Sequence, residues 1–311
     1  MTNKQADPNQ RLDPGGLLHL AVVYVVWSST YLAIRLAVRE GAGFPPFTLG
    51  FMRALVGGIV LIVWAGLRGG RLRITSREAG LLAASGLLLW VGGNGLVTFA
   101  EQRADSGLAA LMVAAAPIWA AILEAIIDRK LPTRQLSFSL FIGFVGIGVL
   151  TVPELASGVR ADSIAMLALV GATITWSAGS VLQARKPVTL SNRASASYQM
   201  LFGAVGFAIV ALLVGEPAPT PTREAWLAYS YLVVFGSVIA FTSYVTVLRV
   251  LPTRIVMTYA YVNPVLAVLL GWFFLREPIT IWTVAGSLFV LIGVAGVFRE
   301  QRPKANRATR G

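Results

Sequence analysis

The chain has 311 residues, of which 56% are apolar and 13% charged, whereas about a quarter of the residues are charged in an ordinary soluble protein. This composition excludes a soluble globular domain, and the absence of cysteine together with a single histidine, His19, excludes disulfides and cysteine or multi-histidine metal sites. The net charge of +12 does not indicate nucleic-acid binding, because the basic residues fall mostly in short segments between apolar runs.

Apolar runs long enough for a membrane helix, roughly 20 residues each, follow one another along nearly the whole chain. Residues 1–15 are polar and lack the order of a cleaved signal peptide, so the first helix is expected to start insertion. We predict an all-α integral membrane protein with ten transmembrane helices, at about 16–38, 45–67, 78–98, 105–127, 135–152, 162–184, 193–214, 225–248, 254–275 and 279–298. The fifth and tenth are rich in glycine, which predicts close packing against neighbouring helices.

The chain repeats itself at an interval of about half its length. Trp27-Ser28-Ser29-Thr30 in the first run is echoed by Trp176-Ser177 in the sixth, and Pro117 in the fourth by Pro264 in the ninth. Five helices per half is an odd number, so the two halves have opposite orientations in the membrane. Inverted repeats place their substrate site at the midplane, around a central cavity. The expected units are a cytoplasmic tail at 1–15, repeats at 16–152 and 162–298, and a basic cytoplasmic tail at 299–311.

Pro117 and Pro264 lie at the centres of their apolar runs. A proline inside a helix removes an N–H and displaces the carbonyl four residues earlier, here that of Val113 and of Ala260. In hydrocarbon such a carbonyl must be buried in protein or line a wet cavity. We therefore predict that the two prolines break or gate their helices beside an internal path.

Lys and Arg residues fall mostly on one side of the predicted topology, the side that also carries both termini. The positive-inside rule makes that side cytoplasmic. The expected location is the bacterial cytoplasmic (inner) membrane, with multiple spans.

Several segments together resemble the EamA family of the drug/metabolite transporter superfamily over essentially the whole chain. They are Trp27-Ser28-Ser29, Phe51-Met52-Arg53, the run from Ala109 through Pro117, Asn263-Pro264 and Glu277-Pro278. The chain looks most like the ten-helix bacterial exporters of amino acids and related metabolites, which implies two inverted five-helix halves and alternating access. It departs from the family at Arg129-Lys130, where a glycine-glutamate pair is usual.

Arg53 lies inside the second apolar run, where a central arginine costs about 2.5–3.5 kcal/mol on insertion scales. One interpretation makes it the site for a substrate carboxylate, which guanidinium groups bind bidentately. The other, which the sequence favours, has it reaching Glu40 or Glu101 as a structural lock. Glu124, near the cytoplasmic end of the fourth run, is the candidate for proton coupling, although its depth favours an interfacial ion pair.

Aromatic and polar residues at mid-depth form the predicted substrate site. A buried Trp or Tyr needs a hydrogen-bond partner, and a mostly apolar cavity with a few convergent polar groups suits a small amphipathic molecule. Each residue has local helix packing as its alternative role. The set is Trp27, Ser28, Thr30, Tyr31, Arg53, Trp90, Asn94, Phe99, Trp119, Trp176, Tyr244, Tyr259 and Asn263. Aromatics at span ends, Phe44, Tyr229, Tyr231 and Trp282, are instead expected to anchor the interface.

No nucleophile-base pair, paired carboxylates or metal-ligand cluster stands out, so no catalytic residue, metal or cofactor is predicted. The predicted function is export of small amphipathic metabolites, with aromatic or other neutral amino acids first. The alternatives are proton antiport of other metabolites or drugs, an intramembrane lipid-acting enzyme, which is disfavoured, and a membrane scaffold without a cavity. The expected partners are a small-molecule substrate and membrane lipid, with no nucleic acid, and a monomer is expected with a dimer as the alternative. Neither the exact substrate nor the choice between facilitated and proton-coupled transport follows from the sequence.

Overall fold

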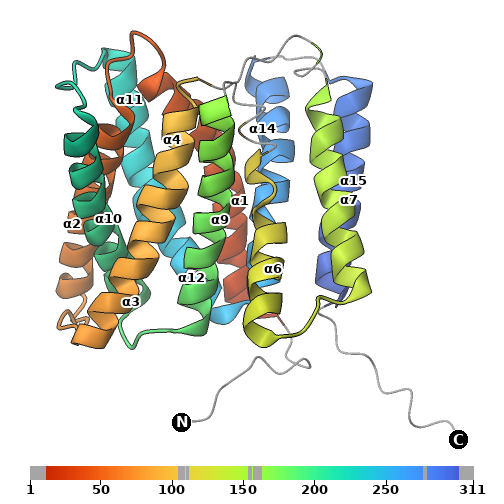
Figure 1. The fold of residues 1–311 in the computed structure, drawn as a ribbon, viewed down its shortest axis with the longest axis horizontal. Coiled ribbons are helices and arrows are strands. Elements are labelled where there is room, and N and C mark those ends of the chain that lie inside the picture. The colour runs from red at the N-terminus through yellow and green to blue at the C-terminus, as the bar shows by residue number, and fades with distance from the viewer. Residues whose placement is uncertain are drawn as a thin grey trace, which may run out of the picture.

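A computed structural model of the chain describes residues 12–103, 109, 112–152, 156, 163–275 and 279–300. These residues form helices that run side by side in one bundle, and no strand occurs among them (Figure 1). The all-helical prediction is therefore confirmed.

The first half of the chain supplies the helices that follow. They are α1 (Pro14–Val38), α2 (Pro46–Leu67), α3 (Ser76–Gly86), which continues through the π-helical segment η1 (Leu87–Gly95) into α4 (Leu96–Ala100), α6 (Ala116–Asp128) and α7 (Arg134–Leu150).

The second half repeats this order. Its helices are α9 (Ser163–Arg185), α10 (Asn192–Val214), α11 (Arg223–Tyr231), which continues through the π-helical segment η2 (Leu232–Phe241) into α12 (Thr242–Val250), α13 (Thr253–Val256), α14 (Tyr259–Leu275) and α15 (Ile281–Glu300). Each half thus carries a π-helical segment in its third long helix.

Side-chain caps fix where several helices begin, as the sequence pattern of Ser, Thr and Asp before apolar runs requires. Asp13 accepts a hydrogen bond from the Gly16 amide at 2.6 Å, and Thr75 forms a capping box with Glu78. Helix α2 begins with a proline. Its first turn is capped by Glu216, which follows the end of α10 and accepts hydrogen bonds from the amides of Phe47 and Thr48 at 2.8 and 2.7 Å. These three contacts satisfy backbone amides that the first turn of a helix leaves unpaired.

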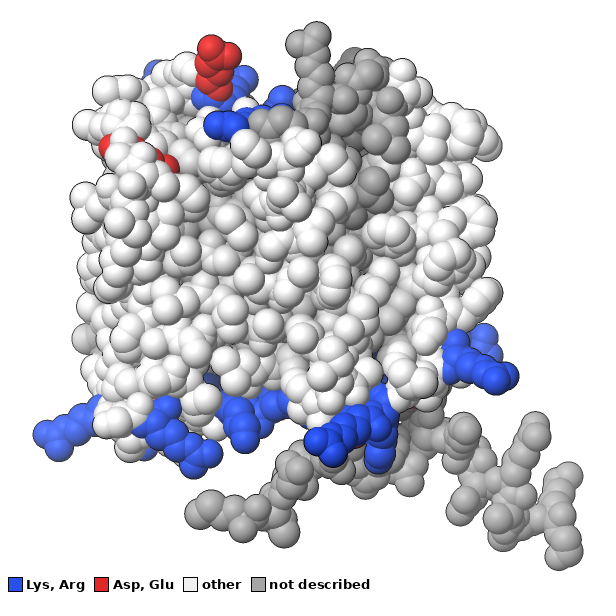
Figure 2. Space-filling model, viewed as in Figure 1, with Lys and Arg blue, Asp and Glu red and all other residues white. Residues whose placement is uncertain are grey.

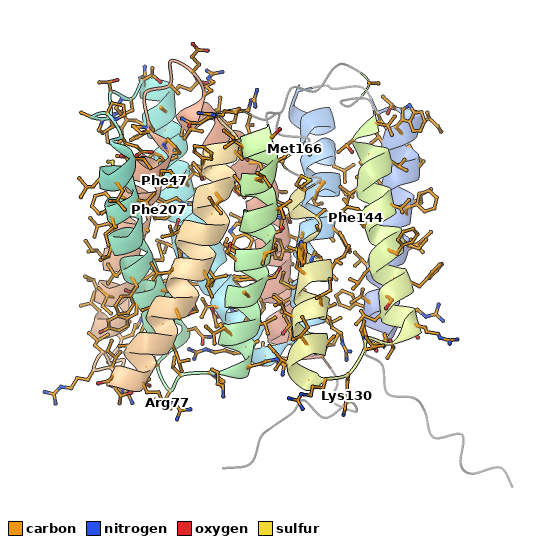
Figure 3. All side chains as sticks on the ribbon, viewed as in Figure 1. Phe47, Arg77, Lys130, Phe144, Met166 and Phe207 are labelled. Atoms are coloured by element: carbon orange, nitrogen blue, oxygen red, sulfur yellow. The ribbon has the colours of Figure 1, made fainter. Side chains whose placement is uncertain are left out.

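Seven helices in the described residues are long and apolar enough to cross a membrane, and α7 is a shorter apolar helix. They are α1, α2, α3 through α4, α9, α10, α11 through α12, and α15. Figure 2 shows a belt without charged side chains around the middle of the visible face and Lys and Arg gathered at its lower end. Arg77 and Lys130 lie there in Figure 3. We call this the basic end of the bundle and the other the opposite end.

The fourth and ninth predicted spans are each interrupted. Helix α6 begins at Ala116 after a turn at Ala114 and Ala115, and the part of this span at 105–108, 110 and 111 lies outside the described residues. The ninth span is divided by a turn at Met257 and Thr258, between α13 and α14. Breaks therefore occur in both segments in which a proline predicted one.

The two prolines occupy different positions within these segments. Pro117 lies in the first turn of α6, where a missing N–H costs nothing, so it opens a helix and does not interrupt one. Pro264 lies inside α14, as predicted. The carbonyl of Ala116 accepts a hydrogen bond from Ser177 of α9 at 2.9 Å, so a backbone group at this break is satisfied by the other half of the chain.

Two of the predicted interface anchors are packed inside the protein. Phe44 and Tyr229 are buried and stack on each other at 5.7 Å, and Tyr229 donates to the carbonyl of Met52 at 3.2 Å. For these two the prediction was wrong, because both rings pack into a cluster of buried residues formed by α1, the α1–α2 connection and α11. Trp282 is 45% exposed on α15, in keeping with an anchor.

Helices α7 and α15 pack through their glycines, as the composition of the fifth and tenth runs predicts. A Cβ on Gly293 would lie 2.6 Å from the backbone nitrogen of Gly143, and one on Gly146 would lie 2.6 Å from that of Val290. The two backbones are therefore in direct contact, and the pair forms one edge of the bundle in Figure 1. A Cβ on Gly148 of α7 would meet no atom within 4 Å, so this glycine takes no part in the contact between the helices.

Gly293→Leu is expected to separate α7 from α15 and to lower the stability of the purified protein by about 1–3 kcal/mol or more, the usual cost of overpacking. The melting temperature in detergent measures this effect. Gly148→Leu, on the same helix pair but facing open space, is the matched control and should melt like the wild type. Equal losses in both variants would show that the glycines matter only for helix insertion.

Candidate functional site

A cavity of about 70 Å³ lies in the half of the bundle away from the basic end. Both halves of the chain line it. Eight of the thirteen predicted substrate residues are in its wall, namely Trp27, Thr30, Tyr31, Arg53, Asn94, Trp176, Tyr259 and Asn263.

The other five predicted residues lie behind the wall or away from it. Trp90 and Tyr244 are buried directly behind wall residues, and Ser28 bonds the carbonyl of Val25 in its own helix at 2.6 Å. Phe99 stacks on Phe47, with ring centroids 6.0 Å apart. Trp119 is not among the residues that line the cavity.

Seven further wall residues were missed by the sequence analysis: Ile34, Gly93, Val97, Val113, Ala116, Ala172 and Thr173. All are small or apolar except Thr173. Helical spacing was the available signal, because Thr173 lies one turn before Trp176 on α9, and Ile34 one turn after Thr30 on α1.

An aromatic cluster forms the floor of the cavity toward the basic end. The Trp27 ring meets those of Trp176, Tyr244 and Tyr259 at centroid distances of 5.3, 4.9 and 5.1 Å, and two of these contacts are edge to face. Rings at these distances are attractive and close-packed. We call these four residues the aromatic floor.

Hydrogen bonds hold the rings of the aromatic floor in place. The Trp27 indole donates to the carbonyl of Gly236 at 3.2 Å, and that of Trp176 to the Tyr244 hydroxyl at 3.0 Å. The same hydroxyl lies 2.6 Å from Ser180 Oγ. Each indole N–H therefore has an acceptor within the protein in this conformation.

Arg53 is the charged group in the cavity wall. Its residue is only 4% exposed, Nε donates to Ser237 Oγ at 2.7 Å and Nη1 to Asn94 Oδ1 at 3.2 Å. The guanidinium also lies over the Trp90 ring, 5.3 Å from its centroid, a cation–π distance. In the described residues Arg53 does not form the expected lock to Glu40 or Glu101. Its partners are the neutral side chains of Asn94 and Ser237, one on each π-helical segment.

Ser237 was missed by the sequence analysis although it had a signal. It is the polar residue in the apolar run Phe235-Gly236-Ser237-Val238, at the depth of a membrane centre. The hydroxyl donates to the carbonyl of Leu232 five residues earlier at 3.0 Å, which is π-helical spacing. This wider, π-helical turn directs the side chain of Ser237 toward Arg53.

Asn263 stands beside Pro264 in the cavity wall, as predicted. In the amide orientation that satisfies its surroundings, its nitrogen donates to the carbonyl of Tyr259 at 3.0 Å and to that of Tyr24 at 3.2 Å. Asn263 therefore joins α14 to α1 next to the aromatic floor.

Glu124 lies at the basic end, far from the cavity wall along α6, and faces Thr253, Arg185 and Arg254. Nearby, Arg185 forms two hydrogen bonds to Asp128 at 2.6 Å each. The ion pair at this end is thus formed by Asp128, and the ion-pair role of Glu124 stays a prediction.

A bundle of membrane helices with an aromatic and polar cavity at its centre has the architecture of a multi-pass transporter. The scaffold alternative requires a solid apolar centre, which this bundle lacks. The EamA-like transporter family matches residues 14–152 and 163–299. The chain belongs to the EamA-like transporter family, and its fold is the two-repeat fold of that family.

Similar proteins carry transporter names without substrates. An uncharacterized inner membrane transporter of Escherichia coli (strain K12), YedA, is 37% identical over 255 residues, which cover 81% of this chain and 80% of YedA. The uncharacterized transporter YoaV of Bacillus subtilis (strain 168) is 20% identical, with 89% of this chain and 94% of YoaV covered. A crystal structure of a protein 22% identical to this chain has a TM-score of 0.75, covers 90% of this chain and 95% of its own, and shares the fold.

Tyr244→Phe is expected to destabilise the protein by about 1–3 kcal/mol, because it removes the buried hydroxyl that bonds Ser180 and accepts from the Trp176 N–H. Thermal melting in detergent measures the change. Tyr231→Phe is the control, since its partner Ser29 keeps a bond to the carbonyl of Val26 at 2.8 Å and no group is left unpaired. A Tyr244→Phe variant as stable as this control would contradict the role given to the hydroxyl.

Proposed function

We propose that the protein is a secondary transporter that exports small amphipathic carboxylates, foremost neutral or aromatic amino acids, across the cytoplasmic membrane by alternating access. The observation that carries the proposal is the position of Arg53, a buried guanidinium with neutral partners in the wall of an aromatic cavity. Transporter function itself follows from the family, whereas the substrate class rests on this site.

The chemistry of Arg53 supports a carboxylate ligand. A guanidinium has five N–H donors, and the described structure engages Nε and Nη1 with Ser237 and Asn94. Burial of a cation without an anion is unfavourable. A substrate carboxylate that accepts from the remaining donors supplies the missing negative charge in bidentate geometry.

The rest of the wall supports an apolar or aromatic substrate body. Trp27, Trp176 and Tyr259 present ring surface on the floor side of the cavity, and Ile34, Val97 and Val113 present aliphatic surface further along. Aromatic and aliphatic walls bind an apolar side chain through buried area and ring contacts.

The orientation of the cavity in the membrane rests on topology. Applied to the charges of Figure 2, the positive-inside rule makes the basic end cytoplasmic, with both chain termini on that side of the inner membrane. The cavity then lies in the outer half of the bundle, and the aromatic floor separates it from the cytoplasm. This arrangement is the outward-facing state of an alternating-access cycle that a monomer completes by itself.

Proteoliposomes loaded with radiolabelled phenylalanine or leucine are expected to release the labelled amino acid faster than liposomes without the protein. Trp176→Ala removes part of the aromatic floor and is expected to slow release about tenfold, equivalent to ~1.4 kcal/mol. Trp282→Ala, at an exposed position on α15, is the matched tryptophan control and should release substrate at the wild-type rate. Equal rates in both variants would move the site elsewhere, and no release of any amino acid by the wild type would overturn the substrate class.

The role of Arg53 is tested by competition between an amino acid and its amide. Loss of a charge-assisted pair costs about 1.5–3 kcal/mol, so phenylalanine amide should compete with labelled phenylalanine about 10- to 100-fold more weakly than phenylalanine itself. In Arg53→Gln this discrimination should disappear. Unchanged discrimination in that variant would exclude Arg53 as the carboxylate ligand.

A further inference from the structure

A second pocket lies at the basic end of the bundle, between helices of both halves. Helices α3 and α9 meet α10 and α12 there, at the lower end of the bundle in Figure 1. The free volume of about 10 Å³ has room for roughly one water-sized group, so the pocket is closed in this conformation. Its polar wall consists of Ser85, Gln183, Lys186, Ser195, Gln199 and Arg249.

Two buried amide groups in this wall have incomplete hydrogen bonding. Gln199 Nε2 donates to Gln183 Oε1 and to Ser85 Oγ, both at 2.8 Å. Within the described part of the chain, neither Gln183 Nε2 nor Gln199 Oε1 has a partner, although the two residues are only 8% and 1% exposed. Buried polar atoms without a partner are rare because they cost free energy. The pocket therefore contains one unused donor and one unused acceptor on adjacent amides.

Arg249, in the last turn of α12, adds a cation to the same wall. Nη1 donates to the carbonyl of Leu190 at 2.7 Å and Nη2 to Ser195 Oγ at 2.5 Å. These two bonds use part of the five N–H donors of a guanidinium. The ion pairs of the described residues do not include Arg249. Like Arg53 in the cavity, it is a guanidinium with neutral partners.

The internal repeat relates this pocket to the cavity. Gln183 follows Trp176 by seven residues on α9, and the cavity-wall residue Ile34 follows Trp27 by seven residues on α1. The two positions are therefore equivalent in the two halves of the chain. One lines the cavity, and the other lines the pocket at the basic end.

Gln199 is the counterpart of Arg53 by its place in the repeat and by its contact. Arg53 of α2 donates to Ser237 in the third long helix of the second half at 2.7 Å. Gln199 of α10 donates to Ser85 in the third long helix of the first half at 2.8 Å. Inverted repeats move against each other so that equivalent surfaces face opposite sides of the membrane in turn. The pocket is thus the cytoplasmic counterpart of the cavity.

We propose that this pocket is a cytoplasmic binding site for the zwitterion of a neutral amino acid, formed by Gln183, Gln199 and Arg249. The substrate carboxylate accepts from Arg249 and from Gln183 Nε2, and its ammonium group donates to Gln199 Oε1. This inference rests on the proposed export function and extends it, because the pocket has to widen in the inward-facing conformation to admit the substrate. The amino acid is then passed to the cavity that contains Arg53.

A site of this kind makes affinity depend on different residues from the two sides of the membrane. A carrier with one central site would use the same residues for substrate from either side. The Michaelis constant, KM, measured separately from each side distinguishes the two cases.

Transport of radiolabelled phenylalanine is measured in two kinds of membrane vesicle, with vesicles that lack the protein as background. Inverted vesicles take up phenylalanine from the cytoplasmic side. Right-side-out vesicles loaded with unlabelled phenylalanine take up the label from the outer side by exchange. Gln183→Leu removes the amide at similar volume, and Arg53→Gln is the matched change in the cavity.

Gln183→Leu is expected to raise KM from the cytoplasmic side about three- to tenfold, the effect of one lost hydrogen bond, and to leave KM from the outer side unchanged. Arg53→Gln is expected to do the reverse. An equal rise from both sides in Gln183→Leu, or no rise from the cytoplasmic side, overturns the inference and leaves the export function standing. A wild type that moves phenylalanine in neither kind of vesicle overturns the export function itself.

A second measurement detects binding without transport and uses the absence of cysteine from the chain. Leu82 is a buried residue in the pocket wall, and Leu61 is a buried residue of α2 outside it. Leu82→Cys is expected to react with a membrane-impermeant maleimide in inverted vesicles, and phenylalanine is expected to slow this reaction. Leu61→Cys, the matched control, should stay unmodified.

Protection of Leu82→Cys by phenylalanine is expected to be lost when Gln183→Leu is added, because the amide that holds the carboxylate is then absent. A Leu82→Cys variant that stays unmodified from the cytoplasmic side shows that the pocket does not open, and overturns the inference. Modification that phenylalanine does not slow, or protection that persists in the double variant, also overturns it.

Discussion

A guanidinium in the dry interior of a membrane protein has to keep its hydrogen bonds within the chain, and Arg53 does so by joining segments from both halves. Asn94 belongs to the first half and Ser237 to the second, and Trp90 covers the cation from one face. One side chain therefore sets the separation of the two halves at the cavity. The cavity wall depends on this contact, because α1, α2 and the two π-helical segments all meet there.

The π-helical segments explain how polar atoms reach this contact from otherwise apolar helices. A π-helical turn contains an extra residue, which shifts the following side chains around the helix axis. In η2 this shift directs Ser237 toward Arg53, and the absence of a side chain at Gly236 admits the guanidinium, since a Cβ there would lie 3.0 Å from Arg53 Nη2. The chain thus combines an apolar membrane helix with a polar contact point, without a break in the helix.

Sequence reasoning predicted those features of the fold that depend on composition and spacing. The apolar runs located the helices, the glycines located the α7 and α15 contact, and the repeated Trp-Ser segments located Trp27 and Trp176 in the site. It did not predict the partners of Arg53, because a single polar residue such as Ser237 in an apolar run indicates a depth but not the direction in which a π-helical turn points its side chain. It also misplaced Phe44 and Tyr229, since depth along a span does not reveal which segment folds over an aromatic ring.

The aromatic floor has a consequence for the membrane that contains the protein. An empty cavity that faces the outer side would become a water-filled conduit if its base were lined by mobile or hydrated side chains. Trp27, Trp176, Tyr244 and Tyr259 are instead in ring-to-ring contact, and both indole N–H groups are used within the protein. A layer of packed rings with internally paired N–H groups offers ions no polar path, so in this conformation the cavity is closed on the side of the basic end.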